Sequence, residues 1–387
     1  MNRIVRIASL LAPAILLAAC GQHAMTAMPS SALTDLRMAT DVRANCDIVP
    51  ERHARCFSVV RTDAFAHALP DQAGYGPNDL QSAYKLPSAT AGSGQTIGVV
   101  DAYDDANAES DLQLYRSHFG LSDCTTANGC FMKVNQRGRP RPLPKPNSGW
   151  AAEISLDLDM VSAICPNCHI VLVEADDDSA TNLGESVDTA ATIGTDVIST
   201  TFGMAESGSK KFEKYYHHPG HMITATIGDG GSSVSFPGSS PDVTAVGGTT
   251  LMRAHNSRGW TETIWSGVDP QCSTVYARPS WQTHTGCAMR ASGDVGAVAD
   301  PNTGVVVVFQ GRFLVFGGTS VASPIIAGVY GLAGNSSALH FGSYSYRHLG
   351  ELFAVLGAAR PCGPVCHDSR GYDGSTGNGT PDGTGAF

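Results

Sequence analysis

Short apolar runs alternate with amphipathic stretches along the chain from Gln95 onward. The apolar runs, bounded by turn-forming residues, predict buried strands at residues 96–100, 170–173, 196–201, 222–227, 243–246, 295–299 and 305–309. Apolar residues at helical spacing predict helices at residues 108–118, 151–164, 180–193 and from 320 to about 334. Strands that alternate with helices indicate an α/β fold with a doubly wound, mainly parallel sheet.

The predicted helix at residues 151–164 places acidic side chains on a face that should point inward. Glu153 and Asp157 lie one turn apart and share their stripe with apolar residues. Asp159 and Ser155 fall on the opposite face, where we expect them in solvent. Two inward carboxyl groups are costly unless they are paired or protonated, which is typical of a functional site.

A second candidate lies at residues 316–324, which read FGGTSVASP. The two glycines allow a tight turn, and Ser320 then stands at the start of a helix, where backbone N–H groups are free to support negative charge. An ordinary N-cap serine is the alternative. With its small residues and Pro324, the segment resembles the nucleophile segment of subtilisin-like serine peptidases.

The histidine expected beside such a nucleophile is missing from the sequence. None of the 13 histidines is followed by glycine, and His221, which follows Gly220, leads into a predicted strand. A different base is therefore needed, and the pair formed by Glu153 and Asp157 is the obvious candidate.

These features together resemble the sedolisin (serine-carboxyl peptidase) family, in which a glutamate replaces the subtilisin histidine. The resemblance covers residues 76–387. It rests on GP at 76–77 with Leu80 and AY at 83–84, VVDAY at 99–103, the stretch 150–175, ISTTFG at 198–203, IGD at 227–229, FPGSSP at 236–241, VTAVGGT at 243–249, GGTSVASP at 317–324 and GYDG at 371–374.

The resemblance implies a role for each matching residue. Ser320 would be the nucleophile, Glu153 its general base, Asp157 the group that orients Glu153, and Asp229 part of the oxyanion hole. The segment from Ser199 to Gly203 would flank the cleft and pair with an extended substrate, although an ordinary strand end is the alternative. Asp101 ends the first predicted strand, where a turn or capping role is favoured over proton sharing.

The family pattern is incomplete at two places. Residues 21–75 are too few for the large prosegment that the resemblance implies. The C-terminal calcium site of the family is matched by Gly371 and Asp373, but Ala354 and Val355 stand where the upstream carboxylate would be. Calcium prefers several hard oxygen ligands, so we expect a weakened or empty site, with Asp368 as an alternative ligand.

The N-terminus predicts export. Two arginines precede an apolar run that is too short to span a bilayer, and the run ends in LAAC at residues 17–20. This order resembles a bacterial lipobox, which would make Cys20 the lipidated first residue of a membrane-anchored lipoprotein. An ordinary cleaved signal, giving a secreted protein, is the alternative. We expect residues 21–75 to form a tether and short lead-in, before a peptidase domain at 76–387.

The remaining ten cysteines fall into pairs that are close in sequence. The simplest pairing is Cys46 with Cys56, Cys124 with Cys130, Cys165 with Cys168, Cys272 with Cys287, and Cys362 with Cys366. A redox or zinc site at Cys165 and Cys168 is the alternative. No second such motif stands nearby to complete a metal site, so a structural bridge is favoured.

The sequence therefore predicts an exported endopeptidase, working as a monomer on protein or peptide substrates. The formal net charge of −10 argues against nucleic acid as a partner. A Glu153 base and a protonated Asp229 donor would require acidic conditions and give a bell-shaped pH profile. A catalytically silent binding lipoprotein on the same scaffold is the main alternative, and the missing histidine argues against a third option, a neutral-pH subtilisin-like hydrolase.

Overall fold

A mostly parallel sheet forms the centre of the structure, a computed structural model that describes residues 42–63, 74–230, 234–355, 357 and 371–387. Its strands run in the order β12, β11, β9, β7, β4, β6, β5, and β15 also pairs with β11. Only β12 is antiparallel to its neighbour. The bounds are β4 Thr96–Ala102, β5 Phe131–Asn135, β6 His169–Ala175, β7 Val197–Thr200, β9 Met222–Thr226, β11 Thr244–Arg253, β12 Trp260–Ile264 and β15 Val295–Val298.

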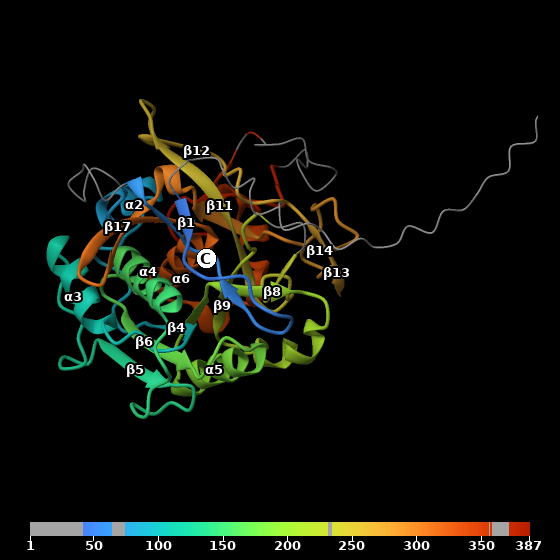
Figure 1. Cartoon of the computed structure of the whole chain (residues 1–387). Helices are drawn as coiled ribbons and strands as arrows, with labels where there is room; N and C mark the ends of the chain where they lie inside the picture. Colours follow the sequence, from blue (N-terminus) through green and yellow to red (C-terminus); the bar gives the residue numbers. More distant parts are fainter. Residues whose placement is uncertain (1–41, 64–73, 231–233, 356, 358–370) are drawn as a thin grey trace, which may run out of the picture. The chain divides into compact units, whose positions relative to one another are not determined.

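Helices cover both faces of this sheet, as Figure 1 shows. One face carries α2, α4 and α6, with α3 packed outside α4, and α5 covers the other. The bounds are α2 Pro77–Ala83, α3 Ala108–His118, α4 Ser148–Ile164, α5 Ala180–Ile193 and α6 Thr319–Ala333. The doubly wound α/β architecture predicted from the alternation is thereby confirmed.

Smaller sheets and turns surround this core. The sheets consist of β1 Val42–Ala44, β3 Val59–Arg61, β17 Arg312–Gly317 and β16 Val305–Phe309; of β10 Ser235–Phe236, β8 Phe202–Ala205 and β2 Arg55–Cys56; of β13 Cys272–Ala277 and β14 Met289–Ala291; and of β18 Leu352–Phe353 and β19 Thr380–Pro381. Short 3₁₀ turns lie at Ser209–Tyr215, Pro301–Thr303, Ser336–Ala338, Phe341–Ser343, Ser345–Arg347 and Leu349–Glu351.

Helix α4 is buried on all sides, which corrects one prediction. Asp159 and Ser155 were expected in solvent, but their side chains are 1% and 2% exposed. Strand β16 and helix α3 cover the face that the helical wheel assigned to solvent. The helix also begins three residues earlier than predicted, because Asn147 caps it by accepting hydrogen bonds from the backbone N–H groups of Gly149 and Trp150.

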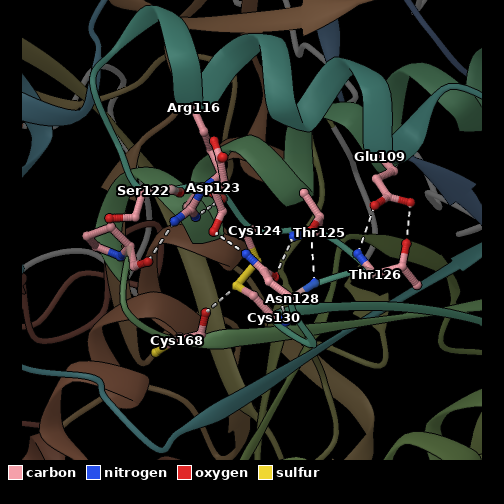
Figure 2. The surroundings of a disulfide bond; sticks show 12 residues. Glu109, Arg116, Ser122, Asp123, Cys124, Thr125, Thr126, Asn128, Cys130 and Cys168 are labelled. Carbon is pink, nitrogen blue, oxygen red and sulfur yellow. Dashed lines mark hydrogen bonds between the residues drawn. A yellow bond between two sulfur atoms is a disulfide. The ribbon is translucent and has the colours of Figure 1, made fainter.

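Four of the predicted disulfides are present, at Cys46–Cys56, Cys124–Cys130, Cys165–Cys168 and Cys272–Cys287. Figure 2 shows how the second of these closes a short loop against α3. In this loop Asn128 Oδ1 accepts from the N–H groups of Thr125 and Cys130, and Glu109 accepts from the backbone of Thr126. Cys362 and Cys366 lie outside the described residues, as does Cys20.

The described part of the chain contains no helix that is long and apolar enough to cross a membrane. The predicted signal at residues 1–20 and most of the tether lie outside the described residues.

Candidate active site

Ser320 stands in the first turn of α6, at the point where β17 delivers the chain to the helix. Gly318 makes this junction possible, because its φ of +97° favours glycine and because a Cβ there would lie 2.0 Å from the carbonyl oxygen of Phe57. The side chain of Ser320 is fully buried. Its Oγ donates to the Thr201 carbonyl at 3.0 Å and accepts the backbone N–H of Phe57 at 3.0 Å.

Three carboxyl groups gather beside this serine from α4 and β4. Glu153, Asp157 and Asp101 are each fully buried. Side chains alternate between the faces of a strand, so Asp101 shares the α4 side of the sheet with Ile97 and Val99. The Oδ2 atom of Asp157 accepts the hydroxyl of Thr201 at 2.9 Å. Neither Glu153 nor Asp101 has a hydrogen-bond partner of ordinary geometry among the described residues.

Burial raises the pKa of all three groups. The pKa of Glu153 rises to about 7, because desolvation outweighs the opposing effect of the Ser320, Ser58 and Thr201 hydroxyls. The pKa of Asp157 and that of Asp101 lie well above the usual range, because burial is reinforced in each by neighbouring negative charge. The cluster therefore retains protons at pH values where exposed carboxyl groups are ionised.

Asp101 does not cap or end a turn, which corrects the favoured interpretation of this residue. It lies inside β4, which continues to Ala102, and its carboxyl group is wholly buried. Its pKa is raised first by burial, then by the charges of Glu153 and Glu174. The alternative of proton sharing remains a prediction.

Asp229 lies on the loop that follows β9 and is held beside Ser320 through the preceding residue, Thr319. Its Oδ1 atom accepts the backbone N–H of Thr319 at 2.9 Å and the Thr319 hydroxyl at 2.6 Å. Its Oδ2 atom is buried without such a partner among the described residues, and lies 2.9 Å from the point where a Cβ on Gly318 would be. Burial raises the pKa of Asp229 to about 7, against the two bonds from Thr319.

The two predicted substrate-contacting residues have different surroundings. Ser199 is fully buried in β7, between β4 and β9. Gly203 lies on β8 and lines a cavity of about 790 Å³, together with Phe57, Gly228 and Asp229. The edge of β8 at Gly203 is already paired with the chain's own strand β2.

The predicted calcium loop is only partly described. Asp373 is buried and its Oδ1 atom accepts the backbone N–H of Ser375, whereas Gly371 is exposed with a φ of +91°. The described residues contain no group of three or more His, Cys, Asp or Glu side chains placed to hold a metal ion. Asp368 lies outside the described residues. The weakened calcium site therefore stays a prediction.

Sequence reasoning did not identify Thr201, Thr319 or the segment around Phe57 as part of this site. Thr201 lies within a motif quoted for the family resemblance, and Thr319 directly precedes Ser320, so both positions carried a signal. Residues 55–58 carried no such signal, because their place beside Ser320 depends on tertiary contacts across more than 250 positions of sequence.

The sequence and the structure both match known peptidases. A family model described as the subtilase family matches residues 145–349. Kumamolisin from Bacillus sp. (strain MN-32) is 30% identical over 292 residues, covering 65% of this chain and 51% of that protein. Sedolisin from Pseudomonas sp. (strain 101) is 25% identical over 315 residues, covering 70% of this chain and 53% of that protein. The chain thus spans about half the length of these two relatives.

A solved structure supports the fold. Pseudomonas sedolisin (serine-carboxyl proteinase), complexed with two molecules of pseudo-iodotyrostatin, matches with a TM-score of 0.67 and 24% identity, covering 80% of this chain and 95% of that chain. At this identity the likeness concerns the fold alone. Because the subtilase model matches more than half of the residues, the chain belongs to the subtilase family, and its similarity to kumamolisin and sedolisin supports the predicted resemblance to the sedolisins.

Proposed function

We propose that this chain is a serine-carboxyl endopeptidase that hydrolyses peptide bonds of proteins or peptides through an acyl-enzyme on Ser320. The observation that supports this most is the placement of two buried carboxyl groups around one serine. The Ser320 hydroxyl influences the pKa of Glu153, and Asp229 is fixed beside the serine through its bonds to Thr319. Each carboxyl can hold or release a proton near neutrality, as acid–base chemistry requires.

In the proposed reaction, Glu153 accepts the Ser320 hydroxyl proton as Oγ attacks the carbonyl carbon of the substrate. The oxyanion forms near Gly318, where the buried Oδ2 atom of a protonated Asp229 donates a hydrogen bond to it. Collapse of this intermediate breaks the C–N bond, and Glu153 gives its proton to the departing amine. Water then attacks the acyl carbon while Glu153 takes its proton, the bond between that carbon and Ser320 Oγ breaks, and Glu153 returns the proton to Oγ as the acid product leaves.

The hydroxyl of Ser320 must turn before this reaction can start. In the present arrangement it donates to the Thr201 carbonyl, not to a carboxylate. Rotation about the Cβ–Oγ bond redirects the proton toward Glu153. Asp157, one helical turn from Glu153 and held by Thr201, would then donate to the ionised Glu153. This is the positioning role that the resemblance implies for Asp157.

The proposed pH dependence follows from the pKa values of Glu153 and Asp229. The productive state has Glu153 ionised and Asp229 protonated. Since burial raises both pKa values to about 7, the activity falls as Asp229 loses its proton above neutrality and falls again as Glu153 is protonated in acid. Because the two pKa values nearly coincide, the productive state is most populated near neutrality and declines on both sides of it.

Cleavage of an unfolded protein is the direct test. The backbone N–H of Phe57 is bonded to Ser320 Oγ, and its ring packs beside Gly203 and Gly228. The assay therefore uses Phe57→Gly, which removes this ring, beside the wild type. Each protein is paired with its Ser320→Ala counterpart. Cleavage that is present in a protein and absent in its Ser320→Ala counterpart supports the proposal. A folded Phe57→Gly chain that cleaves at no pH would overturn it and favour a silent binding protein.

We also propose that the chain is exported and anchored at a bacterial envelope through lipidated Cys20. The four disulfides support an oxidising compartment. Incorporation of labelled fatty acid, compared between the wild type and Cys20→Ser in a bacterial host, tests the anchor. Label in the wild type alone supports it, and secretion without label would favour an ordinary cleaved signal.

A further inference from the structure

Thr201 contacts both ends of the proposed catalytic chain. It stands where β7 ends and β8 begins, and its side chain is fully buried. Its carbonyl oxygen accepts the Ser320 hydroxyl at 3.0 Å, and its own hydroxyl donates to Asp157 Oδ2 at 2.9 Å. Thr201 therefore joins the two groups between which Glu153 acts in the proposed reaction.

The bond from Thr201 gives different roles to the two carboxyl oxygens of Asp157. A threonine hydroxyl carries a single proton, and here that proton is given to Oδ2. Because Oδ2 accepts this bond, the proton of a protonated Asp157 belongs on Oδ1. Oδ1 is buried and has no hydrogen-bond partner among the described residues. It is thus the oxygen left to donate to Glu153, which lies one turn away on α4.

The charges around Asp157 favour its protonated form. Its pKa lies well above the usual range, because burial is reinforced by the negative charges of Asp101 on β4 and Glu153 on α4. The other groups that act on this cluster are Glu174 on β6 with its ion-pair partner Lys133 on β5, Asp229 after β9, and the hydroxyls of Ser320 and Ser58. The bond from Thr201 acts in the opposite direction, so its loss would raise the pKa of Asp157 further. Asp157 therefore holds a proton, and Thr201 decides which of its oxygens bears it.

We propose that Thr201 is a positioning residue of the peptidase reaction, whose hydroxyl holds Asp157 Oδ2 as an acceptor and so directs the proton on Oδ1 toward Glu153. This rests on the proposed function, because it takes Glu153 to be the base. Asp157 keeps its proton throughout and gives only a hydrogen bond to the ionised Glu153. The role accounts for a buried threonine hydroxyl that points at Asp157 in the middle of a carboxyl cluster.

Cleavage kinetics test this role in the Phe57→Gly chain used for the cleavage assay. Thr201→Val removes the hydroxyl but keeps the branched shape of the side chain, and Thr201→Ser keeps the hydroxyl. Thr200→Val is the matched control, because the equally buried Thr200 hydroxyl donates to the Thr224 carbonyl at 2.8 Å instead. The readouts are kcat, KM and the pH profile of kcat/KM.

Thr201→Val should lower kcat by on the order of tenfold, which is within the range for loss of one buried hydrogen bond. KM should change little, because the lost bond is made to a carboxyl group of the protein. The acid limb of kcat/KM should move to higher pH, since the hydroxyl lowers the pKa of Glu153 and its loss raises that pKa. Thr201→Ser and Thr200→Val should stay close to the parent. A Thr201→Val protein with the kcat and the acid limb of Thr200→Val would overturn the proposal.

Stability measurements test the bond between Thr201 and Asp157 without catalysis. In full-length chains that carry Ser320→Ala, urea denaturation gives the destabilisation caused by Thr201→Val in the parent, in Asp157→Asn and in Asp157→Leu. The amide oxygen of Asp157→Asn can still accept the Thr201 hydroxyl, whereas Asp157→Leu has no acceptor. Thr201→Val should therefore destabilise the first two proteins similarly and the third clearly less. Equal destabilisation in all three would overturn the bond and with it the proposal.

The two measurements separate this role from the proposed function. A parent that cleaves nothing, with the expected pattern of stabilities, would contradict the peptidase and leave the bond from Thr201 to Asp157 standing. A parent that cleaves, with Thr201→Val as active as Thr200→Val, would leave the peptidase standing and contradict the positioning role. If Thr201→Val does not fold, Asp157→Asn against Asp157→Ala decides. The amide keeps its oxygen on Thr201 and turns its NH₂ group toward Glu153, so it should retain at least about tenfold more activity, and equal losses would overturn the proposal.

Discussion

Two kinds of buried carboxyl group occur in this molecule, and helix α4 carries one of each. Asp159 is buried, but its Oδ2 atom accepts the backbone N–H of Val308 at 2.8 Å. Glu153, on the same helix, is equally buried and has no such partner among the described residues. Burial is the largest cause of a raised pKa in both. A raised pKa therefore does not distinguish them, whereas their partners do.

The same contrast holds farther from α4. Asp111 accepts the N–H groups of Gln310 and Gly311, and Asp294 forms a bidentate ion pair with Arg290. These carboxyl groups hold neighbouring segments together, such as α3 and the turn between β16 and β17. Most carboxyl oxygens of the cluster beside Ser320 have no hydrogen-bond partner among the described residues, which costs stability and keeps them available to a reacting group. The difference teaches that unpaired buried acids, not buried acids in general, mark the candidate site.

The largest expected effect concerns the nucleophile. In a Phe57→Gly background, Ser320→Ala should lower kcat by a factor on the order of 10⁴ to 10⁶, as loss of a catalytic serine does in other peptidases. Far-UV circular dichroism should be unchanged, because the side chain is small. Comparable cleavage by both proteins would remove Ser320 from the reaction.

Glu153→Gln should have the next largest effect. The amide cannot accept the Ser320 proton, so kcat should fall by roughly 10² to 10⁴. Stability should hold or rise, since an unpaired buried acid is replaced by a neutral group. Thermal unfolding and peptide hydrolysis, measured on the same preparation, check both parts. A fully active Glu153→Gln protein would contradict the claim that the unpaired buried carboxyl groups serve catalysis.

A smaller loss of rate is expected for Asp229→Asn, because the amide still donates to an oxyanion while its oxygen keeps the bonds from Thr319. The loss should stay below the 10²- to 10³-fold that removal of an oxyanion donor causes. The fall in activity above about pH 7 should disappear, since the donor no longer titrates. An unaltered alkaline limb in the pH–rate profile would show that Asp229 does not set it.

The smallest effect on activity is predicted for Asp159, the buried acid whose carboxyl group has a hydrogen-bond donor. Its replacement should lower the stability of the fold instead. Asp159→Ala leaves the buried N–H of Val308 without its hydrogen-bond acceptor and should lower the free energy of unfolding by about 1–3 kcal/mol. Asp101→Asn should cost little, because the carboxyl group it replaces has no hydrogen-bond partner among the described residues. Urea denaturation of both variants checks the comparison. If Asp101→Asn destabilised the protein more than Asp159→Ala, our assignment of Asp101 to the unpaired carboxyl groups and of Asp159 to the partnered ones would be wrong.

Much of the fold could be predicted from local pattern. Helices α3 and α5 and strand β16 have the predicted bounds, because periodicity and caps act within each segment. Strand β11 continues to Arg253, well past the predicted residue 246, because its second half pairs with β12 as an antiparallel ribbon. That extension depends on a partner strand and has no counterpart in the local apolar pattern.

The site was predictable in its residue types and less so in its surroundings. Glu153 and Asp157 were identified because the apolar stripe of α4 indicates which face of the helix points toward the core. The same pattern misplaced Asp159, because it cannot reveal that strand β16 and helix α3 cover the outer face. Phe57 could not be found at all, since only tertiary pairing with β8 brings the segment to Ser320.

The dependence of peptide cleavage on pH tests the central claim most directly. We would measure kcat/KM for Phe57→Gly from about pH 3 to about pH 9, beside the same protein with Ser320→Ala. The account predicts a bell-shaped profile that falls through an alkaline limb near pH 7 and is absent without Ser320. A rate that keeps rising in alkali, or that survives Ser320→Ala, would contradict it.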